Sequence, residues 1–239
     1  MATDGSTSNA AASHQGVRRI EAGSVIGLAA GLVGIALPIG LVLLATYDPG
    51  LRLLTGKQLI ETAAILAIAG ALLFAISLLV FRLGFSRLRT FDRRFWSASI
   101  LAMLGTVGML LLIVPIAIAF ASSDAISNCI AGAPSHALTC VRSVSPLASY
   151  WAIAAFWLLW LGGLGVVIGV GLAASRFHQV AFYGGAAVYA ILLLGLLGPA
   201  LGLLLPFVSL TYPLLAAPFL ILLASALTFQ GCRRALQRG

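Results

Sequence analysis

Long apolar runs, separated by short polar or charged stretches, dominate the chain. About 20 consecutive apolar residues are needed to cross the roughly 30 Å hydrocarbon core of a bilayer as a helix. The last apolar region, Val180–Phe229, is too long for one span, so we expect a turn at Leu205–Thr211, around Pro206. The pattern predicts an all-α, polytopic six-helix transmembrane bundle over residues 21–231, with spans at about residues 25–46, 59–81, 99–121, 150–174, 180–204 and 212–230.

Composition excludes a water-soluble globular protein. Hydrophobic residues make up 61% of the chain and charged residues 8%, with a mean hydropathy of +1.10. A typical soluble domain is about 45–50% apolar and about 25% charged. The net charge of +8 would suggest a nucleic-acid partner in a soluble protein, but here the arginines sit at the ends of apolar runs, where they fix orientation. No stacking aromatics or zinc spacing accompanies them, so we expect the bilayer, and no nucleic acid, as the partner.

The segment Arg82–Trp96 decides the sidedness, because positively charged loops stay in the cytoplasm. Placing it there puts both termini in the cytoplasm and makes the chain a multi-pass protein, expected in the plasma membrane. Only Arg52, Lys57 and Arg142 of the 14 basic residues then lie outside. The inner basic residues are Arg18, Arg19, Arg82, Arg87, Arg89, Arg93, Arg94, Arg176, Arg233, Arg234 and Arg238.

Within this arginine loop, apolar residues recur every three to four positions: Phe85, Leu88, Phe91, Phe95 and Trp96. That spacing predicts a short interfacial helix with its apolar face in the acyl boundary. Its arginines would then lie over lipid phosphates. The residues expected to anchor headgroups are Arg82, Arg87, Arg89, Arg93 and Arg94.

The polar segments outside the spans predict two tails and one large loop. Residues 1–20 are expected to form a disordered cytoplasmic tail, and residues 232–239 a basic cytoplasmic tail. Residues 122–148 form the predicted extracellular loop, which contains Cys129 and Cys140. A bridge between these two thiols would stabilise the loop by roughly 3 kcal/mol; the alternative is two unpaired thiols. We expect Cys232, on the inner side, to be a free thiol.

Glycines spaced by four residues predict close helix contacts. They stack on one face of the first, fourth and fifth spans: Gly23, Gly27, Gly31, Gly165, Gly169, Gly198 and Gly202. Small residues let helix backbones approach in lipid, where burial of apolar surface gives no net drive. These faces favour either a compact bundle or an interface with another copy or subunit.

Few residues in the spans can carry chemistry. Glu61, near the start of the second span, is the one carboxylate within a span. It is either an interfacial residue paired with Arg52 or Lys57, or part of a proton or cation site. No metal cluster, bis-histidine pair or enzyme motif is found, so we expect no catalytic residue, cofactor or metal. The other polar groups are hydroxyls, including those of Ser77, Thr106, Tyr183, Tyr189, Tyr212 and Ser225, which suit interhelical hydrogen bonds or a path for a neutral solute.

A family resemblance is carried by the arginine loop and by the spans on its C-terminal side. GFSRL in this loop resembles a Gly-Phe-x-x-Leu segment of an archaeal membrane family known as domain of unknown function 973. The run from Gly165 through Phe177 into Gly184-Gly185 is similar to the later spans of that family. The resemblance covers about Leu72–Arg234 and implies a multi-pass helical membrane protein. It implies no catalytic or binding residue, because the family itself is uncharacterised.

Low ionisable content and glycine faces favour a non-enzymatic structural, accessory or assembly subunit of a membrane complex. The alternative is a permease or channel for a small solute or lipid. A membrane enzyme is the third hypothesis. A polar cavity between helices would favour transport, and a solid bundle with one flat small-residue face would favour an accessory subunit.

Overall fold

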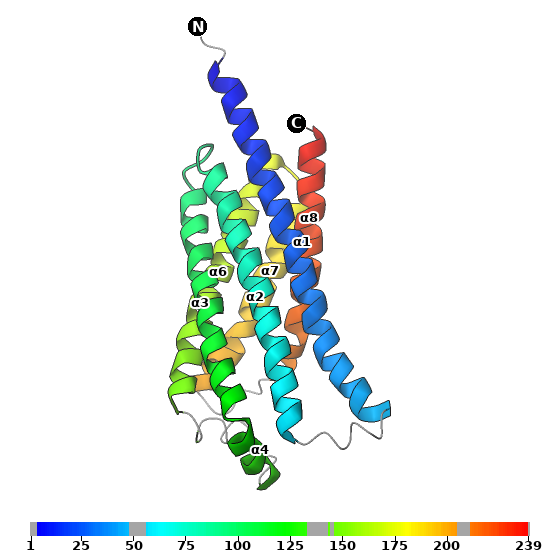
Figure 1. Ribbon diagram of the computed structural model, residues 1–239. Helices are drawn as coiled ribbons and strands as arrows, with labels where there is room; N and C mark the ends of the chain where they lie inside the picture. Colours follow the sequence, from blue (N-terminus) through cyan, green and yellow to red (C-terminus); the bar gives the residue numbers. More distant parts are fainter. Residues whose placement is uncertain (1–3, 48–55, 133–142, 144–145, 205–210, 239) are drawn as a thin grey trace.

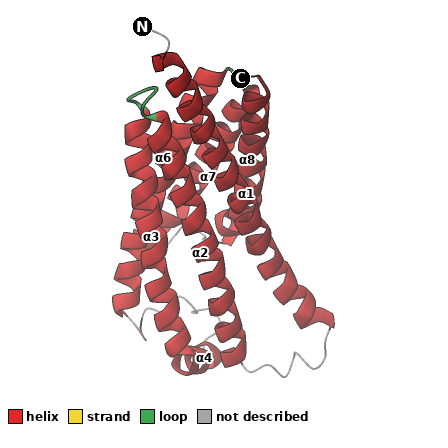
Figure 2. Ribbon diagram, turned by 45° about the horizontal axis from the view of Figure 1, so that its top comes forward, coloured by secondary structure: helices red, strands yellow, loops and turns green. Residues whose placement is uncertain are grey.

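The computed structural model describes residues 4–47, 56–132, 143, 146–204 and 211–238 of the chain. Side-chain surroundings are described for a smaller part, chiefly residues 13–35, 61–129, 150–197 and 216–237. The described residues are helical apart from short turns, and no strand occurs among them (Figure 2). The all-α prediction is therefore confirmed for this part of the chain.

Six long helices and one short helix make up the described structure. Five of the long helices contain segments that are long and apolar enough to cross a membrane: 64–88, 95–118, 150–177, 180–197 and 216–237. This marks the protein as a multi-pass membrane protein. The predicted first span, 25–46, belongs to α1 and is not among these five. The helices are α1 (Asp4–Tyr47), α2 (Gly56–Leu88), α3 (Phe95–Ala121), α4 (Ser123–Gly132), α6 (Pro146–Phe177), α7 (Val180–Leu204) and α8 (Thr211–Arg238).

The predicted division of the last apolar region is seen in the helix bounds. Helix α7 ends at Leu204 and α8 begins at Thr211, on either side of the expected turn. Residues 205–210 lie outside the described part of the chain.

The six long helices form a closed ring. Each packs mainly against two neighbours, in the order α1, α2, α3, α6, α7, α8 and back to α1. Both chain ends lie at the same end of the bundle as the turn between α2 and α3, and α4 lies at the opposite end (Figure 1). We call these the terminal end and the α4 end.

The predicted disordered tail is wrong for the described residues, because α1 is already helical at Asp4. Val17 and Ile20 are buried, and Ile20 packs against Gly84 of α2. These apolar contacts hold the chain in a helix beyond the predicted span. The described part of the predicted tail, 232–238, belongs to α8, and Cys232 is fully buried.

The predicted interfacial helix in the arginine loop is also wrong. Helix α2 continues to Leu88, a turn comes next, and α3 begins at Phe95. Phe85, Leu88 and Phe95 are buried in the protein core instead of facing acyl chains. The spacing of these three residues correctly indicates an apolar helix face. Neighbouring helices cover this face, and lipid does not.

Stacked phenylalanines form the core at the terminal end. The ring of Phe85 stacks between Phe81 and Phe95, with centroid distances of 6.0 and 6.2 Å. A side chain at Gly169 of α6 would overlap with the Phe85 ring, so this glycine makes room for it. Phe85, the phenylalanine of GFSRL, therefore packs at the contact between α2, α3 and α6.

Candidate functional site: a central apolar cavity

A cavity of about 270 Å³ lies within the ring of helices. Phe81 and Val166 separate it from the densely packed terminal end. For comparison, an engineered cavity of about 150 Å³ with apolar walls stays dry and binds benzene. All six long helices contribute to its wall, including Ala30, Ser77, Met109, Trp160, Tyr189 and Pro218.

The cavity wall carries no charge. None of its described lining residues is an aspartate, glutamate, lysine, arginine or histidine. An ion placed there would lose its hydration without gaining a partner, which costs several kcal/mol or more. The cavity therefore suits an uncharged, mainly apolar molecule and is unsuited to conducting ions.

Two of the polar side chains on the wall donate hydrogen bonds to backbone carbonyls. Ser77 donates a hydrogen bond to the Gly23 carbonyl of α1 at 2.8 Å. Trp160 Nε1 donates to the Leu193 carbonyl of α7 at 3.1 Å. Both bonds join neighbouring helices, so they also hold the ring together.

The third polar group on the wall is the hydroxyl of Tyr189. It forms a buried hydrogen bond of 3.0 Å with Ser225 of α8, and either hydroxyl can be the donor. The hydroxyls of Ser77, Tyr189 and Ser225 thus make interhelical contacts, as their presence in apolar spans predicted. Thr106 instead bonds to the Ala102 carbonyl of its own helix, and Tyr183 is exposed.

The glycines of α1 lie between α1 and its two neighbours. A Cβ at Gly23 would meet Phe81 of α2 at 3.3 Å, and one at Gly27 would lie 2.6 Å from the Ser225 hydroxyl oxygen. A Cβ at Gly31 would lie 3.1 Å from the Pro218 carbonyl oxygen. This face is thus occupied within the bundle.

The closest helix contact involves Gly105, Gly108 and Gly162, which four-residue spacing did not identify, together with Gly165, which it did. A Cβ at Gly105 of α3 would lie 2.6 Å from the Gly162 Cα of α6. One at Gly108 would be equally close to the Leu159 backbone nitrogen, and one at Gly165 to the Ala102 backbone nitrogen. The signal available in the sequence was the three-residue spacing of both pairs, Gly105 with Gly108 and Gly162 with Gly165. The surroundings of Gly198 and Gly202 lie outside the described side chains.

Glu61 lies at the α4 end, away from the cavity wall. Its carboxylate accepts a hydrogen bond of 3.3 Å from the hydroxyl of Ser123, the first residue of α4. Ser123 is buried, and this contact joins α2 to α4. The predicted partners Arg52 and Lys57 lie outside the described side chains, so that pairing stays a prediction.

The predicted disulfide lies partly outside the described residues. Cys129 lies in α4, whereas Cys140 is outside the described residues, so the bridge stays a prediction. Cys232 is a free thiol, buried in the core between α8 and its neighbours.

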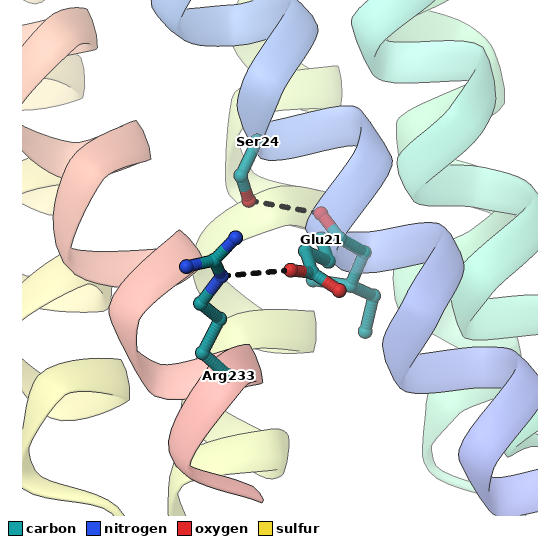
Figure 3. A network of polar contacts seen from close by, with 4 residues as sticks. Glu21, Ser24 and Arg233 are labelled. Atoms are coloured by element: carbon teal, nitrogen blue, oxygen red, sulfur yellow. Dashed lines mark hydrogen bonds and ion pairs between the residues drawn. The ribbon is translucent and has the colours of Figure 1, made fainter. Parts of the chain in front are cut away.

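The predicted headgroup arginines line the turn between α2 and α3. Arg87, Arg89, Arg93 and Arg94 are exposed, and Arg82 is half-buried. At the same end of the bundle, Arg233 of α8 lies 3.5 Å from the Glu21 carboxylate of α1 (Figure 3). The exposed guanidinium also lies 4.8 Å from the centroid of the Phe229 ring of its own helix. The ion pair with Glu21 joins α8 to α1 at the surface.

A second hollow, of about 260 Å³, lies at the terminal end between α1, the turn from α6 to α7, and α8. Its lining is partly polar and includes Ser13, His14, Arg176 and Gln179. The Arg176 guanidinium is held 5.2 Å above the Phe91 ring. This hollow is separate from the apolar cavity, because the two share no lining residue.

Comparison of the chain with protein-family models, curated proteins and solved structures found no match. The resemblance to the archaeal family therefore stays a prediction. The function of the chain has to be inferred from the fold and the cavity.

Proposed function

We propose that this multi-pass membrane protein binds an uncharged apolar molecule in the cavity lined by its six long helices. The expected sign of transport was a polar cavity, and the wall found is mainly apolar, so it does not support a path for a polar solute. It fits instead a permease or carrier for a small apolar solute or for part of a lipid. The observation that supports the proposal is the cavity itself, about 270 Å³ with an uncharged wall drawn from every long helix. Ligand sites between the helices of a bundle are typically of this kind.

A role as an accessory subunit has less support in the described residues. It rested largely on the glycine faces, which would have formed a surface for a partner. Gly23, Gly27 and Gly31 instead pack against α2 and α8 of the same chain, and Gly165 packs against α3. None of the predicted glycine faces with described surroundings is left over for a partner.

We further propose that α1 supplies a sixth span and that both termini lie in the cytoplasm of a plasma-membrane protein. At 1.5 Å per residue, the 44 residues of α1 extend about 66 Å, more than twice the hydrocarbon thickness. The arginine-rich turn and both chain ends share one end of the bundle, as the excess of positive charge on cytoplasmic segments requires.

The cavity proposal is tested by filling the cavity. Gly70 lines the wall, and a Cβ placed there meets no atom within 4 Å, so Gly70→Leu adds bulk without a clash at the Cβ. Gly171→Leu is the matched control, because a Cβ there is equally free but Gly171 does not line the cavity.

The readout uses Trp160, which lies on the wall, as the remaining tryptophan after the other three are replaced by phenylalanine. Bromooctane quenches tryptophan fluorescence only at short range, so bound bromooctane should quench Trp160 in detergent-solubilised protein. We expect Gly70→Leu to weaken this quenching at least tenfold and Gly171→Leu to leave it unchanged. Equal quenching in the two variants would refute ligand binding in the cavity.

A further inference from the structure

The Tyr189–Ser225 pair leaves one hydrogen-bond donor unused. Each hydroxyl carries one proton, and the bond between them uses one of the two. Each oxygen thus has one partner, and neither hydroxyl makes a second hydrogen bond in the described part of the chain. Ser24 and Thr228, by contrast, each donate to the carbonyl four residues earlier in their own helix.

The unused donor is best assigned to Tyr189. Tyr189 lines the cavity, whereas Ser225 does not, and a Cβ at Gly27 would lie 2.6 Å from the Ser225 oxygen. The Ser225 hydroxyl is thus enclosed between α1 and α7. If Ser225 donates to Tyr189, the phenolic O–H remains for a group in the cavity.

We infer that the cavity ligand carries one uncharged oxygen, a hydroxyl or a carbonyl, which accepts a hydrogen bond from Tyr189. This inference rests on the proposed function and narrows its ligand class. A buried donor without a partner costs free energy, so an oxygen at this position binds better than a methylene. The Ser77 oxygen, whose own proton goes to Gly23, offers an acceptor on the same wall and so accommodates a ligand hydroxyl. A carboxylate or ammonium group is excluded, because the lining has no counter-charge.

The test compares bromooctane with bromooctanol, which differ by one hydroxyl, through quenching of Trp160. Concentrations are expressed as mole fractions in the micelle, so that different partitioning of the probes cancels. We expect bromooctanol to bind about threefold to tenfold more tightly, the range given by one neutral hydrogen bond. Equal binding of the two probes would overturn the inference and leave the proposed function standing. Failure of both probes to quench would overturn both.

Two variants locate the donor. In Tyr189→Phe, the preference for bromooctanol over bromooctane should disappear. In Ser225→Ala, the preference should persist, because the phenolic proton is still available. If both variants lose the preference equally, the hydroxyl pair is only a structural link and the inference is wrong. If Tyr189→Phe does not fold, the comparison of bromooctane with bromooctanol in the unaltered protein still tests whether the cavity prefers a ligand with a hydroxyl.

Discussion

Replacing Gly105 by alanine should separate two helices that touch backbone to backbone. The added Cβ would lie 2.6 Å from the Gly162 Cα, whereas ordinary van der Waals contact begins at 3.4 Å. Helices α3 and α6 would have to move apart by about 0.8 Å at this level. Since the Gly162 Cα is a backbone atom and the position of a Cβ is fixed by its own backbone, no side-chain rotation can relieve the overlap.

Overpacking and helix propensity change the stability of Gly105→Ala in opposite directions. A gap of about 0.5–1 Å forfeits a quarter to a half of the dispersion attraction along a contact, and overpacking a core typically costs about 1–3 kcal/mol. Alanine gains up to about 1 kcal/mol over glycine in helix propensity. Gly171→Ala, on α6, gains helix propensity without any overpacking, because a Cβ there meets nothing within 4 Å. We therefore expect Gly105→Ala to be about 2 kcal/mol less stable than Gly171→Ala.

The assay is reversible unfolding in mixed micelles with increasing denaturing detergent, followed by tryptophan fluorescence. Gly105→Ala should unfold at a lower detergent fraction than the unaltered protein, and Gly171→Ala at the same or a higher fraction. The double variant Gly105→Ala with Gly162→Ala should be worse than either single change, because both Cβ atoms enter the same contact. If Gly105→Ala matches or exceeds Gly171→Ala in stability, α3 and α6 are not in backbone contact.

Three further predictions concern the two ends of the bundle. Glu61→Gln should leave abundance and bromooctane quenching unchanged, because the amide oxygen can still accept the hydrogen bond from Ser123. Loss of quenching would give Glu61 a part in ligand binding. An impermeant thiol reagent on intact cells should label Ser143→Cys but not Ser86→Cys, because the arginine-rich turn is expected inside; the reverse pattern would invert the topology. Intact-mass analysis after alkylation without reductant should show Cys129 and Cys140 unmodified, whereas alkylation of both would disprove the bridge.

The sequence alone determined that the chain is helical and crosses a membrane several times. Runs of about 20 apolar residues can satisfy their backbone hydrogen bonds in lipid only as helices or closed barrels. The bounds of α7 match the predicted span, 180–204, because polar residues and a proline-containing turn limit it on both sides. The hydroxyls of Ser77, Tyr189 and Ser225 could also be predicted to join helices, since an apolar span offers them few other partners.

Tertiary structure decided where the helices end and which groups lie between them. Lipid and protein cover an apolar face equally well, so spacing could not tell whether Phe85 and Leu88 face acyl chains or a neighbouring helix. The same ambiguity hid the packed start of α1, where Val17 and Ile20 look like isolated apolar residues in a polar tail. Glycine spacing indicated close contacts but not their partners. The cavity had no local signal at all, because it exists only where six helices, far apart in sequence, close into a ring.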